Sequence, residues 1–183
     1  MYNIFKITFL FLILSLFSCK PKTYNIDIKN KNLKFAGSLL YYNDQPFSGI
    51  LSSKVDTVVV NTISYLQGVK HGKEEKLHAN GKIALIRFHQ NGKETGTHKA
   101  WWSNGQLKFI KNFNNEGLPI GMQQEWHSNG KQAKELNYKE GKEFGSQKMW
   151  DYNGKIIANY QVINGERFGL IGSVNCKSDN YVD

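Results

Sequence analysis

The chain has 183 residues, of which 40% are apolar and 21% charged, and this globular composition excludes a disordered chain. Its two cysteines, Cys19 and Cys176, are too few for a disulfide scaffold. The formal net charge of +9 favours anionic partners such as phospholipid headgroups, acidic glycans or nucleic acid. The alternative is that the lysines only solvate the surface of a sheet and protect its edges. Because no basic cluster is dense, we expect no nucleic-acid partner.

Residues 1–18 form a predicted signal peptide. Met1–Lys6 carries one positive charge, and Ile7–Phe17 is apolar apart from Thr8 and Ser15. A helix of that length spans about 16 Å, roughly half of the ~30 Å hydrocarbon core. The segment is therefore too short to cross a membrane and has the length of a signal-peptide core.

The end of this segment, Leu16-Phe17-Ser18-Cys19, resembles the lipobox of bacterial lipoproteins. The resemblance implies that diacylglycerol is attached to the Cys19 sulfur, that the chain is cleaved after Ser18, and that the new amino group is acylated. Several acyl chains anchor a protein stably, whereas one alone binds only marginally. Lys20 follows where an aspartate would favour inner-membrane retention, so we expect a lipid-anchored protein of the bacterial cell envelope, in the outer membrane. The alternative is an ordinary cleaved signal with a coincidental cysteine.

Two segments are predicted to precede the main body of the chain. Residues 19–34 are polar, with a proline at 21, and are expected to form a lipid-anchored tether. Residues 35–67 are expected to form a divergent first repeat that caps the domain. Within them, Val55–Ser64 is rich in β-branched residues and predicts a strand pair.

A pair of glycines recurs through residues 68–176 in steps of 24 or 25 residues, which indicates a repeat array. The pairs are Gly68 and Gly72, Gly92 and Gly96, Gly117 and Gly121, Gly141 and Gly145, and Gly165 and Gly169. Asn-Gly pairs at 80, 104, 129 and 153 keep the same step, and each is expected to form a type I′ hairpin turn. Turn glycines every 11 to 13 residues predict an all-β fold, an elongated antiparallel meander of repeated β-hairpins.

A tryptophan follows the second glycine by five residues in three units, at Trp101, Trp126 and Trp150. Equivalent residues of successive hairpins are two strands apart, or about 9.5 Å, so large rings can interleave with neighbouring side chains and fill one face. We therefore expect the tryptophans to be core. The residues predicted to be structural in the repeat are Gly72, Gly96, Gly121, Gly145, Trp101, Trp126 and Trp150.

The Gly-x-x-x-Gly spacing, the mid-strand tryptophan and the Asn-Gly eight residues after the glycine resemble MORN repeats. The match is closer to the bacterial variant often labelled antitoxin-type, over residues 35–176. The resemblance implies membrane association, phospholipid binding or protein scaffolding, and the label implies a toxin partner. Because a cytosolic antitoxin would not need residues 1–19, we predict an envelope binding or scaffolding module. The alternative is an antitoxin or immunity-type partner that neutralises a toxin.

No catalytic site, metal site or cofactor is predicted. His78 and His127 share one repeat position but should stand about 19 Å apart, whereas zinc holds its nitrogen ligands at roughly 2.0–2.1 Å. Glu74 and Glu75 are adjacent, so their side chains point to opposite faces of a strand. No Ser or Cys nucleophile stands in a recognisable motif, and no glycine pattern leads into a helix. We expect a protein that is not an enzyme.

One row of side chains is a candidate binding face, formed by His78, Trp102 and His127 with Asp151. If Trp101 is core, Trp102 points to the other face, where an aromatic ring flanked by lysines can bind a glycan, a peptide or a headgroup. The alternative is that Trp102 stacks on the stem of a neighbouring strand's lysine. Residues 177–183 are predicted to be a flexible polar tail.

Overall fold

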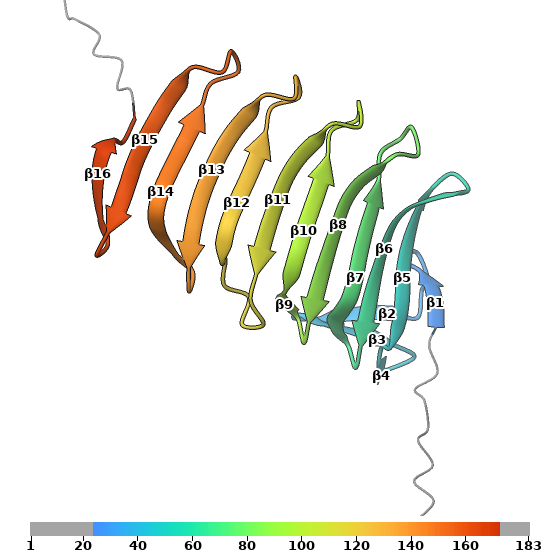
Figure 1. Cartoon of the computed structure of the whole chain (residues 1–183). Helices are drawn as coiled ribbons and strands as arrows, with labels where there is room; N and C mark the ends of the chain where they lie inside the picture. The colour runs from blue at the N-terminus through green and yellow to red at the C-terminus, as the bar shows by residue number, and fades with distance from the viewer. Residues whose placement is uncertain (1–23, 173–183) are drawn as a thin grey trace, which may run out of the picture.

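The computed structural model describes residues 24–172, which form β-strands joined by turns (Figure 1). Within that range there is no helix of the length and apolarity needed to span a bilayer. The predicted signal peptide, the predicted lipidation residue Cys19, and the tail at 177–183 lie outside the described residues.

One long sheet contains most of the strands and confirms the predicted all-β meander of consecutive hairpins. From β5 onward, each strand of its main path pairs antiparallel with the next one (Figure 1). These strands are β5 (Gly49–Val55), β6 (Val58–Leu66), β7 (Val69–Leu77), β8 (Ile83–Gln90), β10 (Gly96–Trp101), β11 (Leu107–Phe113), β12 (Gly121–Trp126), β13 (Gln132–Lys139), β14 (Lys142–Trp150), β15 (Ile156–Ile163) and β16 (Glu166–Leu170). The short β9 (Lys93–Glu94) pairs with β8 alone.

A second, three-stranded sheet covers one end of the long sheet. It consists of β2 (Leu33–Ala36), β3 (Leu39–Tyr42) and β4 (Gln45–Pro46). Backbone hydrogen bonds tie it to the β6–β7 turn, where Leu40 N–H donates to Gly68 O and Gly68 N–H donates to Phe47 O, both at 2.8 Å. Leu40, Phe47, Leu51 and Tyr65 form a buried cluster between the two sheets. This cluster is the hydrophobic core that the cap provides.

The expected tether is wrong from residue 24 onward, because β1 (Tyr24–Asp27) pairs parallel with β5 and β2 begins at Leu33. Ile26 packs against the capping core, which gives this polar segment an apolar contact that fixes it. The strands approach closely because Gly49 has no side chain: a Cβ there would lie 2.1 Å from the Tyr24 carbonyl oxygen.

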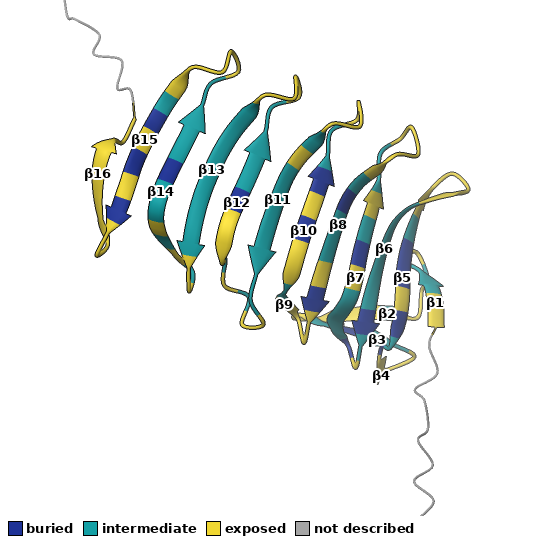
Figure 2. Ribbon diagram, in the orientation of Figure 1, coloured by how far each residue is buried: buried dark blue, intermediate teal, exposed yellow. Residues whose placement is uncertain are grey.

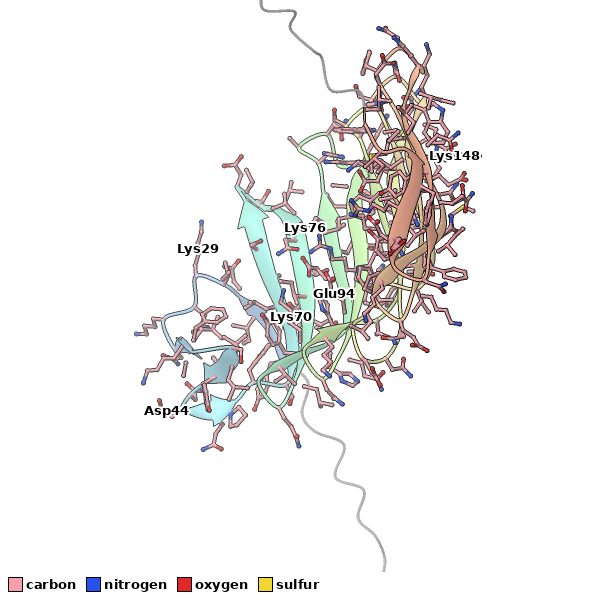
Figure 3. All side chains as sticks on the ribbon, turned by 90° about the vertical axis from the view of Figure 1, so that its left-hand side faces the viewer. Lys29, Asp44, Lys70, Lys76, Glu94 and Lys148 are labelled. Atoms are coloured by element: carbon pink, nitrogen blue, oxygen red, sulfur yellow. The ribbon has the colours of Figure 1, made fainter. Side chains whose placement is uncertain are left out.

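The register of the long sheet defines its two faces, because directly opposed residues share a face. We call the face that packs against the small sheet the inner face, and the opposite one the outer face. Leu51, Ile63, Glu74 and Arg87 oppose one another in succession on the inner face. Figure 3 shows the small sheet standing on the side of Lys70 and Lys76, whereas Lys148 lies on the other side.

The two edges of the sheet use different turns, and the type I′ prediction was placed at the wrong one. At the Asn-Gly turns only the glycine has positive φ, and His127 N–H, for example, donates to Lys131 O across a longer loop. Both central residues have positive φ, as a type I′ turn requires, at the opposite edge. Those turns are Gln67-Gly68, Asn91-Gly92, Glu140-Gly141 and Asn164-Gly165.

The tryptophans are not the buried core of the array, contrary to expectation. Trp101, Trp126 and Trp150 are only half-buried, because in the described chain a single sheet carries no second layer over them. Figure 2 shows buried and exposed residues alternating along several strands instead. A second apolar cluster, Ala158, Tyr160 and Val162 with Met149, lies on β14 and β15.

Candidate binding surface

A buried polar side chain stands two residues after the repeat glycine in four successive units. We call this set the polar column: Glu74, His98, Gln123 and Gln147, each at most 5% exposed. Gln147 shows its role, since its Nε2 donates to the carbonyl oxygens of Asn137 (2.8 Å) and Phe144 (3.1 Å). Its Oε1 accepts from Asn137 N–H at 3.0 Å. Asn137 lies where the β13–β14 register shifts, so the glutamine satisfies backbone groups that the ladder leaves unpaired.

The same device recurs in the neighbouring repeats with different chemistry. Gln123 makes equivalent hydrogen bonds of 2.9 Å to the backbone of Asn112 and Ile120. His98 donates from Nε2 to the Phe88 carbonyl oxygen at 3.0 Å. In three of the four units this repeat position therefore holds a side chain that donates to a carbonyl, and the residue type varies.

Glu74 is the exception in the column, because it binds a side chain. His89 donates from Nε2 to its Oε2 at 3.1 Å. That hydrogen bond, with the positive charges of Lys70, Lys76 and Arg87, outweighs burial and lowers the pKa of Glu74 to about 2. Burial lowers the pKa of His98 below its ordinary value of 6.5. One end of the column is therefore a fixed negative charge and the next position favours a neutral imidazole.

A second set of inner-face side chains lies opposite the repeat glycines. We call it the bulky row: Tyr65, His89, Phe113, Tyr138 and Val162, which oppose Gly49, Gly72, Gly96, Gly121 and Gly145 respectively. The four glycines from Gly72 onward have φ between 63° and 94°, a conformation that other residues rarely adopt. A Cβ at Gly96, Gly121 or Gly145 would meet no atom within 4 Å, so these glycines leave open space beside the large side chain opposite.

Three hollows occur along the bulky row. The first, of about 590 Å³, is lined by Tyr65 and His89 and by Phe35 of the small sheet. The second, of about 330 Å³, is lined by Phe113 and Tyr138, with Pro119 and Leu136. The third, of about 440 Å³, is lined by Tyr138 and Val162.

Ion pairs neutralise much of the charge on the inner face. Lys70 and Lys76 both contact Glu74, and Arg87 lies 3.9 Å from Glu94. Further along, Lys111 and Lys134 flank Glu125 at 3.0 and 3.3 Å. Arg167 contacts Glu143 at 2.8 Å. Such pairs contribute little to stability when they are exposed. Pairing nevertheless weakens the electrostatic field that each charge produces at a distance from the surface.

Several lysines elsewhere on the long sheet lack such a partner. Lys99 and Lys148 lie on the outer face, where the register places Lys99 between Ile86 and Ile110 and Lys148 between Glu135 and Asn159. Lys82, Lys131 and Lys155 follow the Asn-Gly turns along one edge. Within the described residues, none of these five lysines forms an ion pair. The Asn-Gly edge therefore carries three lysines without ion pairs, whereas Lys148 on the outer face is opposite the acidic Glu135.

The predicted binding row of His78, Trp102 and His127 is a hydrogen-bonded ladder between repeats. His78 Nε2 donates to Trp101 O at 2.9 Å, and Trp102 Nε1 donates to Trp126 O at 3.0 Å. His127 Nε2 donates to Trp150 O at 3.1 Å. The alternative interpretation of Trp102 fits better, since the Lys108 ammonium lies 4.3 Å from its ring centroid. These side chains use their polar atoms to bind the next repeat.

Sequence reasoning missed the surface that the inner face forms, although its signals were present. The polar column keeps a fixed offset of two from the glycine, but Glu, His and Gln do not look alike in a sequence. The bulky row stands seven residues before a repeat glycine in most units, and eight before Gly121. Within residues 24–172, no group of three or more His, Cys, Asp or Glu is placed to hold a metal ion.

Comparison with known proteins agrees with the repeat geometry. No curated protein matches the chain. The family model described as MORN repeat variant matches residues 94–115, the segment from the end of β9 through the β10–β11 hairpin. This match, over one unit of the repeated hairpin pattern, supports a MORN-repeat protein.

Proposed function

We propose that the chain is a binding or scaffolding module that is anchored by lipid at Cys19 in the bacterial envelope. Its Asn-Gly edge rests on anionic headgroups. A MORN repeat suggests a binding or scaffolding role. The lipobox-like Leu16 to Cys19 motivates the anchor, and the Lys20 that follows it motivates placement in the outer membrane.

One observation carries the contact with headgroups, the row of lysines without ion pairs along the Asn-Gly edge. The inner-face lysines beside Glu74 and Glu125 are held in ion pairs, whereas Lys82, Lys131 and Lys155 along the Asn-Gly edge form none within the described residues. A tethered protein meets the headgroups at high local concentration, so even a weak field of one sign orients it on the surface. Salt screens such contacts over about 8–10 Å.

The anchor is tested by Cys19→Ser in cells. The variant should move from the detergent-soluble membrane fraction to the soluble fraction, because the acylated sulfur is missing. Unchanged membrane association would contradict the anchor.

The headgroup contact is tested separately with residues 20–183, which keep every described strand. Sedimentation with liposomes of phosphatidylcholine alone, or with added phosphatidylglycerol, measures the preference for anionic lipid. The triple variant Lys82→Gln, Lys131→Gln, Lys155→Gln should lose that preference. The matched triple Lys76→Gln, Lys111→Gln, Lys134→Gln removes the same charge from the inner face and should keep it.

Equal losses in the two triples would mean that only net charge matters and that no face is oriented toward the lipid. Indifference of the unmodified chain to headgroup charge would contradict the proposal. It would then favour the second candidate, a toxin-neutralising protein partner.

A further inference from the structure

The three inner-face hollows follow the period of the repeats. Equivalent residues of successive hairpins are two strands apart, so the bulky row steps by about 9.5 Å. The second and third hollows share Tyr138 and are one step apart, while the first and second are two steps apart. The intervening place, between His89 and Phe113, is filled by the His98 ring, which lies 4.7 Å from the Phe113 ring and 6.3 Å from the His89 ring.

The hollows also share their chemistry. Each combines large apolar or aromatic side chains with two basic residues and one acidic residue. The charged residues are Lys70, Lys93 and Glu94 in the first, Lys111, Lys134 and Glu125 in the second, and Lys142, Arg167 and Glu143 in the third. Lys70 and Glu94 are labelled in Figure 3, where they lie on the side of the small sheet. Each hollow therefore presents an apolar wall and one surplus positive charge.

The step of the hollows selects among the shapes that a bound peptide can take. A polyproline II helix has three residues per turn and rises ~9.3 Å per turn, within a few tenths of an ångström of the ~9.5 Å repeat step. An α-helix returns to the same face after seven residues and ~10.5 Å, so it drifts out of step by about 1 Å per repeat. A β-strand places side chains on one face every ~6.7 Å, which does not match the step. Of these three shapes, the polyproline II helix has the period closest to the step of the hollows.

We propose that the inner face binds an acidic, proline-rich segment of a partner protein in the polyproline II conformation, with one turn of the peptide per repeat. Proline rings pack against the bulky row, and acidic side chains meet the surplus basic residues. Aromatic-lined grooves are a common way to recognise this conformation, because the peptide loses little entropy on binding. The three hollows do not include the lysines of the Asn-Gly edge, so this site does not depend on contact with headgroups.

The probe is a fluorescent peptide of four Pro-Pro-Glu triplets, titrated against the detergent-solubilised full chain by fluorescence anisotropy. Three control peptides separate the elements of the proposal. Six Pro-Glu pairs keep the conformation but break the three-residue period, four Gly-Ser-Glu triplets keep the charge period without the conformation, and four Pro-Pro-Lys triplets reverse the charge. We expect each control to bind at least tenfold more weakly than the probe.

Two lysines on neighbouring strands give a matched pair of variants. Lys134→Gln removes a basic residue of the second hollow and should weaken probe binding several-fold, whereas Lys148→Gln makes the same change on the outer face and should leave it unchanged. Tyr138, which lines two hollows, is tested as Tyr138→Ala and Tyr138→Phe. The first should weaken binding at least tenfold and the second should retain it, provided that circular dichroism shows a folded sheet for both.

The outcomes are distinct from those of the liposome experiment. If the edge triple variant loses its preference for anionic headgroups but still binds the probe, both proposals are supported. If the unmodified chain shows no headgroup preference but binds the probe, only the peptide-binding proposal is supported. No binding of the probe, equal binding of the flexible or two-residue-period peptides, or equal effects of Lys134→Gln and Lys148→Gln would overturn it. Displacement of the probe by a short chitin oligosaccharide at lower concentration than by unlabelled peptide would also overturn it, in favour of a glycan.

Discussion

Glu74 and His98 occupy equivalent places in neighbouring repeats, and acid destabilises the protein through each of them in a different pH range. The pKa of Glu74 is about 2 in the fold and 4.5 ordinarily, so the unfolded chain binds more protons between those values. Its contribution to stability is present above about pH 4.5 and is lost as the pH falls toward 2. The pKa of His98 is also lowered by the fold, so its contribution is lost as the pH falls below 6.5. Both groups make the protein acid-sensitive, in two separate ranges.

We predict that single substitutions separate these two ranges. His98→Gln should remove the loss of stability below pH 6.5. It should keep the hydrogen bond to the Phe88 carbonyl oxygen, because Gln123 donates to the equivalent carbonyl oxygen, that of Asn112, in the next unit. Glu74→Gln should reduce stability at pH 7 by on the order of 3 kcal/mol and flatten the range between pH 5 and 2. Urea unfolding at pH 7.5, 5.5 and 3 measures both effects.

His71→Gln is the control, since His71 lies outside the polar column and hydrogen-bonds to Asn91. The groups facing Glu74, namely His89, Lys70, Lys76 and Arg87, are unchanged in all three variants. An acid-induced loss of stability that persists undiminished in His98→Gln and Glu74→Gln would show that the polar column does not cause it.

The elements of the sheet could largely be predicted from the sequence, but their turns could not. The glycine spacing predicted consecutive hairpins in chain order, because a turn every 11 to 13 residues leaves strands of similar length between the turns. The turn types depend on loop length and register, and Asn-Gly serves both a two-residue turn and a longer loop. The prediction for Trp102 was wrong for a related reason. The register shifts between Ala100 and Trp101, and the sequence does not show which face a side chain occupies beyond such a shift.

Strand β1 is the element that local sequence predicts least and tertiary contact fixes most. Its alternation is short, and its stability depends on pairing with β5 and on Ile26 packing against the cap. Ser52 Oγ also donates to Ile26 O at 3.3 Å. This polar segment can therefore form a strand because Gly49, distant in sequence, has no side chain to clash with it.

We predict that removing β1 destabilises the domain. A chain beginning at residue 29, which keeps all of β2, should be less stable to urea than one beginning at residue 20. The difference should be roughly 2 kcal/mol or more, because an apolar side chain and a strand of hydrogen bonds are lost. A chain beginning at residue 24 is the control and should match the one beginning at residue 20. If all three unfold together, β1 contributes nothing to the fold.

At the scale of the whole molecule, stability should be nearly one-dimensional. From β5 onward every strand of the main path pairs only with its neighbours in sequence, so a repeat is stabilised by itself and by the units on either side. The exception is the N-terminal end, where β1 and the small sheet bring residues before 49 onto β5, β6 and the β6–β7 turn. Removing an internal repeat should therefore shorten the array without disturbing the cap.

Deleting residues 121–144 tests this idea, because it joins Ile120 to Gly145, which takes the place of Gly121 in the repeat. Strand direction, the polar column and the bulky row stay in phase across the junction, so we predict a folded and cooperative protein. Its urea m-value should fall in proportion to the surface lost. Deleting residues 121–132 instead removes one strand, reverses the direction of every later one and should prevent folding or cause aggregation. Circular dichroism and urea unfolding compare the two deletions. If both fold equally well, or if the 24-residue deletion also unfolds the cap, the strands are coupled over a longer range than their pairing indicates.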